Sequence, residues 1–152
     1  MYRILCDSYV LYDPRLPDLF VIEPELTQKK NEPGELSFTI TKEHPHYGVL
    51  EKIKSRIKVY RDDILLWVGH AIEDDRDLYE NRKVIAEGAL SFLVDSVLRP
   101  FTFDGTVAEL FAWILAAHNA RVNESQRLTL GNCDLSSSVG VATKDYLSSW
   151  QA

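Results

Sequence analysis

The sequence has little cysteine and no long apolar run. Of its 152 residues only Cys6 and Cys133 are cysteines. We expect both to be reduced thiols, because disulfides are rare in cytosolic proteins. No stretch has the 18 or so apolar residues of a transmembrane helix. Residues 1–6 also lack the apolar core and small-residue cleavage site of a signal peptide. We therefore expect synthesis in the cytoplasm without a signal peptide, and no membrane insertion.

Positive charge is also in short supply. The chain has 17 Lys and Arg against 23 Asp and Glu, a formal net charge of −6. A nucleic-acid-binding domain needs a basic surface to neutralise phosphates, so we do not expect nucleic acid as a partner. The hydrophobic fraction of 45% is ordinary for a globular protein and argues against wholesale disorder. The length suits one domain, or two small ones that share a core.

Motifs for catalysis and cofactor binding are missing. There is no Gly-x-Ser-x-Gly sequence and no glycine-rich phosphate loop. Cys6 could meet a histidine in space, although a cysteine is more commonly a small buried residue. A glycosidase needs two facing carboxylates, and among 23 acids their mere availability decides nothing. We predict no catalytic residue, no cofactor-binding residue, no cofactor and no enzymatic activity.

Three groups of residues deserve comparison with metal sites. His44 and His46 flank Pro45, but two histidines fall short of the four ligands of a closed zinc site, so a loop turn is favoured. The acidic run Glu73–Asp77 fails the EF-hand spacing and is interpreted as a solvated strand end or an intersubunit patch. His118 is interpreted as a half-buried histidine near a helix C-terminus, where its charged form would be favoured. We predict no metal-binding residue.

The first 90 residues are rich in strand patterns. Leu36, Phe38 and Ile40 alternate with polar residues, which is typical of a half-buried strand. Pro33 and Gly34 fit the centre of a type II turn, and Asp62-Asp63 fits a tight hairpin. Pro24 places an edge or a bulge in the strand that contains it. Further strands are expected over residues 2–6, 20–30, 56–61, 64–72 and 82–88, with residues 73–79 either extending a strand or forming a loop.

The rest of the chain contains helical patterns. Leu90–Leu98 predicts a short helix, and the strongest helix runs over 106–118 with its apolar residues on one face. Thr106 and Glu109 fit a capping box, and Asn119 stands where Asn can replace a C-terminal Gly. Arg127–Leu130 predicts another strand. The fold class expected is α+β, mainly β: a small antiparallel β-barrel or meander, then a helical segment and the start of a further β unit.

This pattern divides the chain into a β-rich domain over 1–90 and a helix-containing segment over 91–152. The second segment is expected to be the start of a domain truncated at the C-terminus. The strand at Ile64–Val68 is apolar on both faces, which a subunit partner covering its outer face would explain. Trp113 and Trp150 fit an interface or a core equally well.

Six segments have a recognisable order and spacing: Asn31–Ile40, His44–Tyr47, Ile57–Asp63, Ile72–Tyr79, Glu87–Ser96 and His118–Val122. They resemble the N-terminal region of phage and prophage minor structural proteins, the tail-tip or baseplate hub family of siphophages of Gram-positive bacteria. The resemblance covers residues from about 20 to 135. It departs from the family pattern at Trp67–His70, where a Phe and an Arg would be expected around the Gly.

The resemblance implies a structural protein of the virion tail that forms a ring, as a trimer of small β-barrels, at the distal end of the tail tube. The implied partners are further copies of the chain and neighbouring tail proteins: the distal tail protein, the tape measure or the tail tube. Two alternatives stay open. One is a cell-wall hydrolase domain of a tail-associated lysin, a peptidase or a glycosidase. The other is a carbohydrate-binding module with an aromatic platform at Tyr9, Tyr12 or Trp67.

Overall fold

A computed structural model describes residues 1–152, which form two compact units, Met1–Ala89 and Leu90–Ala152. Each unit is treated separately below. The first unit is a single curled sheet, and the second combines one α-helix with two short pairs of strands. The fold class is therefore α+β and mainly β, with the helix after the sheet, as the sequence predicts.

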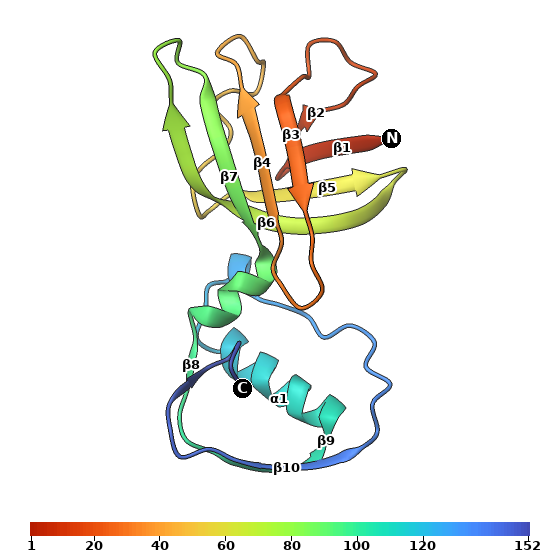
Figure 1. The fold of residues 1–152 in the computed structure, drawn as a ribbon, viewed down its shortest axis with the longest axis vertical. Helices are drawn as coiled ribbons and strands as arrows, with labels where there is room; N and C mark the ends of the chain where they lie inside the picture. The colour runs from red at the N-terminus through yellow and green to blue at the C-terminus, as the bar shows by residue number, and fades with distance from the viewer. The chain divides into compact units, whose positions relative to one another are not determined.

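The first unit is a half-barrel of seven antiparallel strands (Figure 1). The strand order is β2-β1-β5-β6-β7-β4-β3, so β4 pairs with β7 rather than with its sequence neighbour β5. Strands β2 and β3 are the two edges, and they do not pair with each other. The strands are β1 (Tyr2–Cys6), β2 (Tyr9–Tyr12), β3 (Ile22–Thr27), β4 (Glu35–Ile40), β5 (Arg56–Arg61), β6 (Ile64–Arg76) and β7 (Arg82–Gly88).

The turns of this sheet follow the local sequence. Asp62 and Asp63 have φ angles of 49° and 68°, the positive values that a tight hairpin between β5 and β6 requires. Gly34 has a φ of 74°, which confirms the predicted turn residue. Pro24 lies in an edge strand, beside a break in the register between Ile22 and Glu25, so the predicted edge and bulge are both present. Residues 73–76 extend β6.

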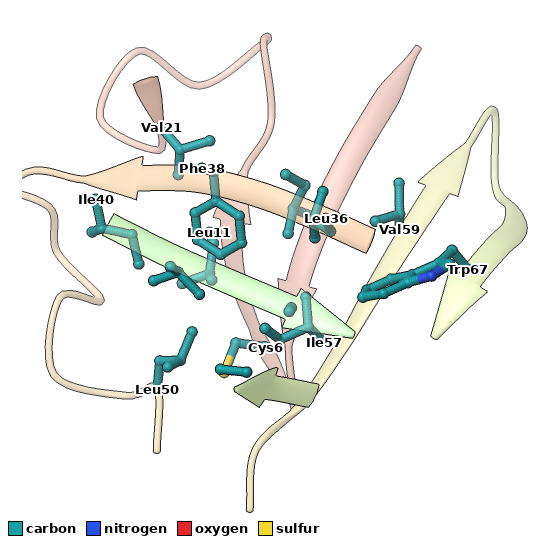
Figure 2. Close-up of a cluster of buried hydrophobic side chains, with 14 residues drawn as sticks. Cys6, Leu11, Val21, Leu36, Phe38, Ile40, Leu50, Ile57, Val59 and Trp67 are labelled. Atoms are coloured by element: carbon teal, nitrogen blue, oxygen red, sulfur yellow. The ribbon is translucent and has the colours of Figure 1, made fainter. Parts of the chain in front are cut away.

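The core of the half-barrel lies on its concave face (Figure 2). It is built by alternate residues of β1, β4, β5 and β7, as the period-two pattern predicts. Leu36, Phe38 and Ile40 are all at most 2% exposed. Cys6 and Leu11 are fully buried in the same cluster.

Trp67 fixes one end of this core and needs glycine around it. Its indole Nε1 donates a hydrogen bond to the carbonyl oxygen of Pro33 at 3.2 Å. A Cβ at Gly69 would lie 2.3 Å from the Trp67 ring, and a Cβ at Gly88 would lie 1.7 Å from the Pro33 oxygen. Both glycines are therefore required by close approach. In the segment Trp67–His70, the sequence differs from the pattern of the proteins it resembles. The large indole of Trp67 packs there against glycine backbone.

The second unit is organised around α1 (Val107–Asn119). Leu110 and Ile114 of this helix bury against Leu98, with Phe101 and Phe103 packed at the margin. Strand β9 pairs with β10, and β8 pairs with β11, both antiparallel. The elements are η1 (Ala89–Val94), β8 (Val97–Leu98), β9 (Thr102–Thr106), α1, η2 (Glu124–Gln126), β10 (Ser138–Ala142) and β11 (Leu147–Ser148).

The capping box at the start of α1 is present as predicted. Thr106 Oγ1 accepts a hydrogen bond from the Glu109 backbone N–H, and the Glu109 carboxylate accepts from the Thr106 backbone N–H at 2.8 Å. Two other features of the predicted helix are wrong. Phe111, expected on the buried face, is 52% exposed. The C-cap residue Ala120 has ordinary right-handed angles, so the chain does not use Asn119 as a substitute for a left-handed glycine.

Two further predictions for this region are corrected. Leu90–Leu98 is not one helix: a 3₁₀ helix ends at Val94 and the short strand β8 follows at Val97–Leu98. Arg127–Leu130 is not a strand. The backbone N–H and carbonyl of Leu128 instead bond the side-chain amide of Asn119, at 2.9 and 2.8 Å, which replaces a strand partner.

Candidate functional site

A groove opens on the concave side of the half-barrel where the sheet fails to close. Its volume is about 440 Å³, against about 370 and 290 Å³ for two other hollows. Tyr12 of edge strand β2 and Leu26 of edge strand β3 both line it, so the groove spans the gap between the two edges. Leu36 and Val59, both nearly buried, contribute to its floor.

The strand registers explain why the walls of this groove are mostly apolar. Ile4 pairs with Val59, and Val59 pairs with Trp67, so all three point to the concave side. Two residues further along the same face, Tyr2 pairs with Arg61 and places both side chains at the groove mouth. No acidic side chain lines the groove, and Arg61 is its sole charged residue.

A second exposed apolar feature is the tip of the β6–β7 hairpin. Leu78 is completely exposed, and Tyr79 is 80% exposed. Neither side chain packs against the core of its own unit. Large apolar side chains in contact only with water are typical of surfaces that a partner covers.

The tip is a fixed turn rather than a loose loop. The Asp77 carboxylate accepts hydrogen bonds from the backbone N–H of Tyr79 at 2.7 Å and of Asn81 at 2.9 Å. Glu80 has a positive φ of 62°, its carboxylate pairs with Lys42, and its carbonyl accepts from the Tyr47 hydroxyl. The backbone that carries Leu78 and Tyr79 is therefore preorganised before any partner arrives.

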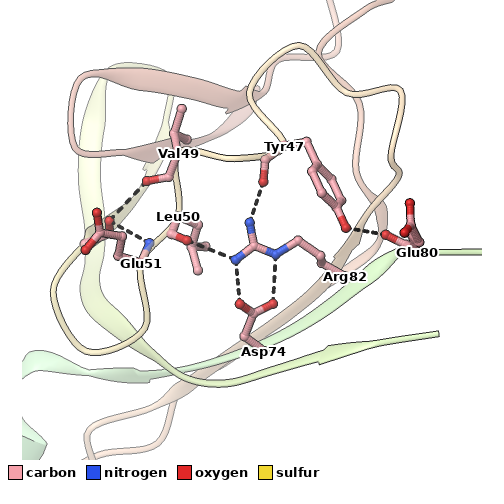
Figure 3. A network of polar contacts seen from close by, with 8 residues as sticks. Tyr47, Val49, Leu50, Glu51, Asp74, Glu80 and Arg82 are labelled. Atoms are coloured by element: carbon pink, nitrogen blue, oxygen red, sulfur yellow. Dashed lines mark hydrogen bonds and ion pairs between the residues drawn. The ribbon is translucent and has the colours of Figure 1, made fainter.

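Two residues of the acidic run Glu73–Asp77 have structural roles: Asp74 pairs with Arg82, and Asp77 holds the turn of the tip. Asp74 forms a two-pronged ion pair with Arg82, with Arg82 Nε donating at 2.8 Å and Nη2 at 2.5 Å (Figure 3). Arg82 also donates to the backbone carbonyls of Tyr47 and Leu50. The guanidinium holds the pKa of the Asp74 carboxyl below its usual range through these hydrogen bonds. The interpretation of the whole run as a solvated strand end therefore fails at Asp74.

The histidine pair at 44 and 46 forms a loop anchor. His44 is 5% exposed; its Nε2 bonds the carbonyl oxygen of Leu11 at 2.8 Å, and its Nδ1 accepts from the backbone N–H of His46 at 3.0 Å. Burial lowers the pKa of His44. The His46 ring stands against Tyr9, with ring centroids 5.1 Å apart. No three His, Cys, Asp or Glu side chains group closely enough to hold a metal ion.

The two cysteines are free thiols in different surroundings. Cys6 is fully buried, and burial raises the pKa of its thiol. Its polar neighbours are Asp7, at 4.0 Å, and Ser55. A buried thiol with a raised pKa is a poor nucleophile, so Cys6 does not provide the cysteine–histidine pair that a peptidase would use. Cys133 is partly exposed.

His118 is fully buried, which corrects the expectation of a half-buried side chain. Its Nε2 donates to the carbonyl oxygen of Gln126 at 3.2 Å, and its Nδ1 lies 2.7 Å from Ser96 Oγ. Ser96 Oγ lies 2.6 Å from Ser149 Oγ. The two hydroxyls and the ring form a closed polar network inside the second unit, which joins α1 to the segments around β8 and β11.

The aromatic residues considered for sugar binding are scattered. Trp67 is 5% exposed and belongs to the core, whereas Tyr9 is 47% exposed and Tyr12 lies at the groove. Trp113 and Trp150 are each 39% exposed, and Trp113 packs on Phe101 with ring centroids 4.5 Å apart. The segment Ile64–Val68 is split: Ile64 and Leu65 are exposed, whereas Trp67 is buried.

Sequence reasoning missed both the groove and the tip. The groove combines residues from six strands, and their convergence depends on the non-sequential strand order. The signal at the tip was visible as Leu78-Tyr79 between acidic residues, an apolar pair in a polar turn.

No helix is long and apolar enough to cross a membrane. No protein-family model matches the chain, and no curated protein matches it in a sequence search.

Proposed function

We propose that the chain is a structural component of a phage tail tip, a baseplate hub protein that assembles as a homotrimeric ring at the distal end of the tail tube. The observation that carries the proposal is the presence of two different uncovered apolar features on one unit, the groove and the β6–β7 tip. Such features are typical of interaction surfaces. Contacts between two different patches are heterologous, and they form closed rings when the rotation between subunits permits.

The phage assignment rests on the sequence resemblance. That resemblance spans about residues 20 to 135 and implies small β-barrels arranged around the tail axis. The curled sheet of Met1–Ala89 is compatible with such a barrel, with one side left open. In this proposal, neighbouring tail proteins bind the ring: the distal tail protein, the tape measure or the tail tube.

The side-chain positions count against two residues on which the alternatives would draw, Cys6 and Trp67. A cysteine peptidase would need an accessible nucleophile, whereas Cys6 is buried with a raised pKa. A sugar-binding platform needs exposed aromatic rings on one face, whereas Trp67 is buried in the core. The groove and the tip have the composition of protein contacts, with leucine, tyrosine and one arginine prominent.

Electron microscopy of the purified protein tests this function. Negatively stained particles are expected to average into rings with three-fold symmetry and a central opening. Particles that remain single small globules at every concentration would overturn the proposal. Clearing of Gram-positive cell walls in a zymogram by the same preparation would also contradict it, because that result belongs to a hydrolase.

A further inference from the structure

The two uncovered features of the half-barrel are both apolar, and their charges are opposite in sign. We propose that the β6–β7 tip of one copy inserts Leu78 and Tyr79 into the half-barrel groove of the next copy. This inference rests on the assembly function proposed above and deepens it, because it names the surfaces that meet. It predicts a head-to-tail contact in which each copy uses its tip on one neighbour and its groove on the other.

The size and the lining of the groove suit this occupant. Its volume of about 440 Å³ falls in the range of roughly 300–1,000 Å³ that proteins use to enclose a ligand. The groove offers Leu26, Leu36 and Val59 to an apolar side chain, and Tyr2 and Tyr12 to an aromatic one. Because the tip turn is already held by Asp77, its insertion would cost little conformational entropy.

Charge fixes the orientation of the contact. Leu78 and Tyr79 follow Asp77, and Asp75 precedes them on β6, whereas the Glu80 carboxylate is already paired with Lys42. In the groove, Arg61 forms no ion pair or hydrogen bond within its own chain, and no acidic residue lines the walls. An acidic turn entering a groove with one unpaired arginine gains electrostatic attraction and fixes the register of the two copies.

The groove and the tip lie at opposite ends of β6. Leu66, near the beginning of β6, lines the groove, whereas the tip follows Arg76 at the end of that strand. Ten residues of strand separate them, on the order of 30 Å at the usual rise. Figure 1 shows the β5–β6 hairpin and the β6–β7 hairpin at the two ends of the curved strand β6. This separation favours the tip of another copy as the occupant of the groove.

Two variants test the contact from its two sides, with light scattering after size exclusion as the measurement. Leu78→Asp places a charge at the centre of the inserted tip, and Arg61→Glu reverses the charge of the groove. Each is expected to weaken self-association by about tenfold or more, the loss that truncating a central interface residue typically causes. Leu135→Asp is the matched control, because Leu135 is also an exposed leucine (59%) but lies outside both surfaces.

Mixing the two variants separates a head-to-tail contact from any other. A Leu78→Asp copy keeps its groove, and an Arg61→Glu copy keeps its tip, so an equimolar mixture is expected to form heterodimers that neither variant forms alone. Both substitutions change exposed side chains, and circular dichroism with thermal unfolding checks that each variant folds.

The outcomes distinguish this inference from the function it rests on. If the wild-type protein assembles and both variants assemble equally well, the tip-in-groove contact is wrong and the ring proposal stands. A mixture of the two variants that contains only monomers also overturns the head-to-tail contact. A wild-type protein that stays monomeric overturns the contact and the ring proposal together.

Discussion

Arg82 makes several polar contacts inside the half-barrel. Its side chain is 4% exposed, and it joins Asp74 of β6 to the backbone of the segment at Tyr47 and Leu50 (Figure 3). A buried charge is tolerated only when paired and hydrogen-bonded. Together with His44, which bonds the Leu11 carbonyl, the guanidinium therefore holds the β4–β5 connection against the sheet.

Removing Arg82 should destabilise the first unit strongly. Arg82→Ala leaves the Asp74 carboxylate without its partner, and breaking a buried ion pair in this way costs about 3–5 kcal/mol. Urea unfolding followed by circular dichroism measures the loss. The neighbouring exposed residue supplies the control: Lys83→Ala should change the free energy of unfolding by no more than about 0.5 kcal/mol. Equal midpoints for the two variants would show that the network carries no stability.

His44 should make stability depend on pH in a defined window. Burial lowers its pKa in the folded protein below the unfolded value of 6.5, and both ring nitrogens are engaged in the neutral form. The unfolded chain therefore binds the proton first as pH falls. Stability from this group is complete above pH 6.5, and it decreases as pH falls from 6.5 toward the folded pKa.

Urea midpoints at pH 8 and pH 5.5 test this dependence. His44→Gln should lose much of the difference between the two pH values, because the titrating group is gone. His46→Gln should keep most of it, since the bond to His44 Nδ1 comes from the backbone N–H of residue 46. The assignment fails if the His44 variant shows the same pH difference as the wild type.

At the scale of elements, the capping box decides where α1 begins. Thr106→Ala removes the side-chain oxygen that accepts from Glu109 N–H and should cost about 0.5–2 kcal/mol. Thr106→Ser keeps the hydroxyl and should retain most of the stability. Thermal unfolding of the three proteins gives the comparison. If the alanine and serine variants melt together, the hydroxyl does not contribute as described.

The sequence predicted those elements whose signal is local: an alternation of apolar residues, a pair of turn residues or a helix cap. The alternation at Leu36–Ile40, the positive-φ pair Asp62-Asp63 and the cap at Thr106 were all evident in the sequence. Strands β9 and β10 were not, because each contains a glycine and is stabilised by a partner more than 30 residues away. Residues Arg127–Leu130 do not form the expected strand. The side-chain amide of Asn119 hydrogen-bonds the backbone N–H and carbonyl of Leu128 in place of a neighbouring strand.

At the scale of the whole molecule, the open half-barrel connects fold to function. A seven-stranded sheet whose edges β2 and β3 do not pair leaves a groove where a closed barrel would have core. Sequence alone could not predict the groove, because Tyr12, Leu26 and Leu66 meet only through the order of the strands. In a ring, the tip of the neighbouring copy would cover this apolar surface.

The mass of the protein in solution shows directly whether this ring forms. Sedimentation equilibrium over a wide concentration range should give a limiting mass of three times the 17.4 kDa of one chain. The assembly should dissociate in the Leu78→Asp variant under the same conditions. A wild-type mass that stays at 17.4 kDa at every concentration would contradict assembly through the half-barrel.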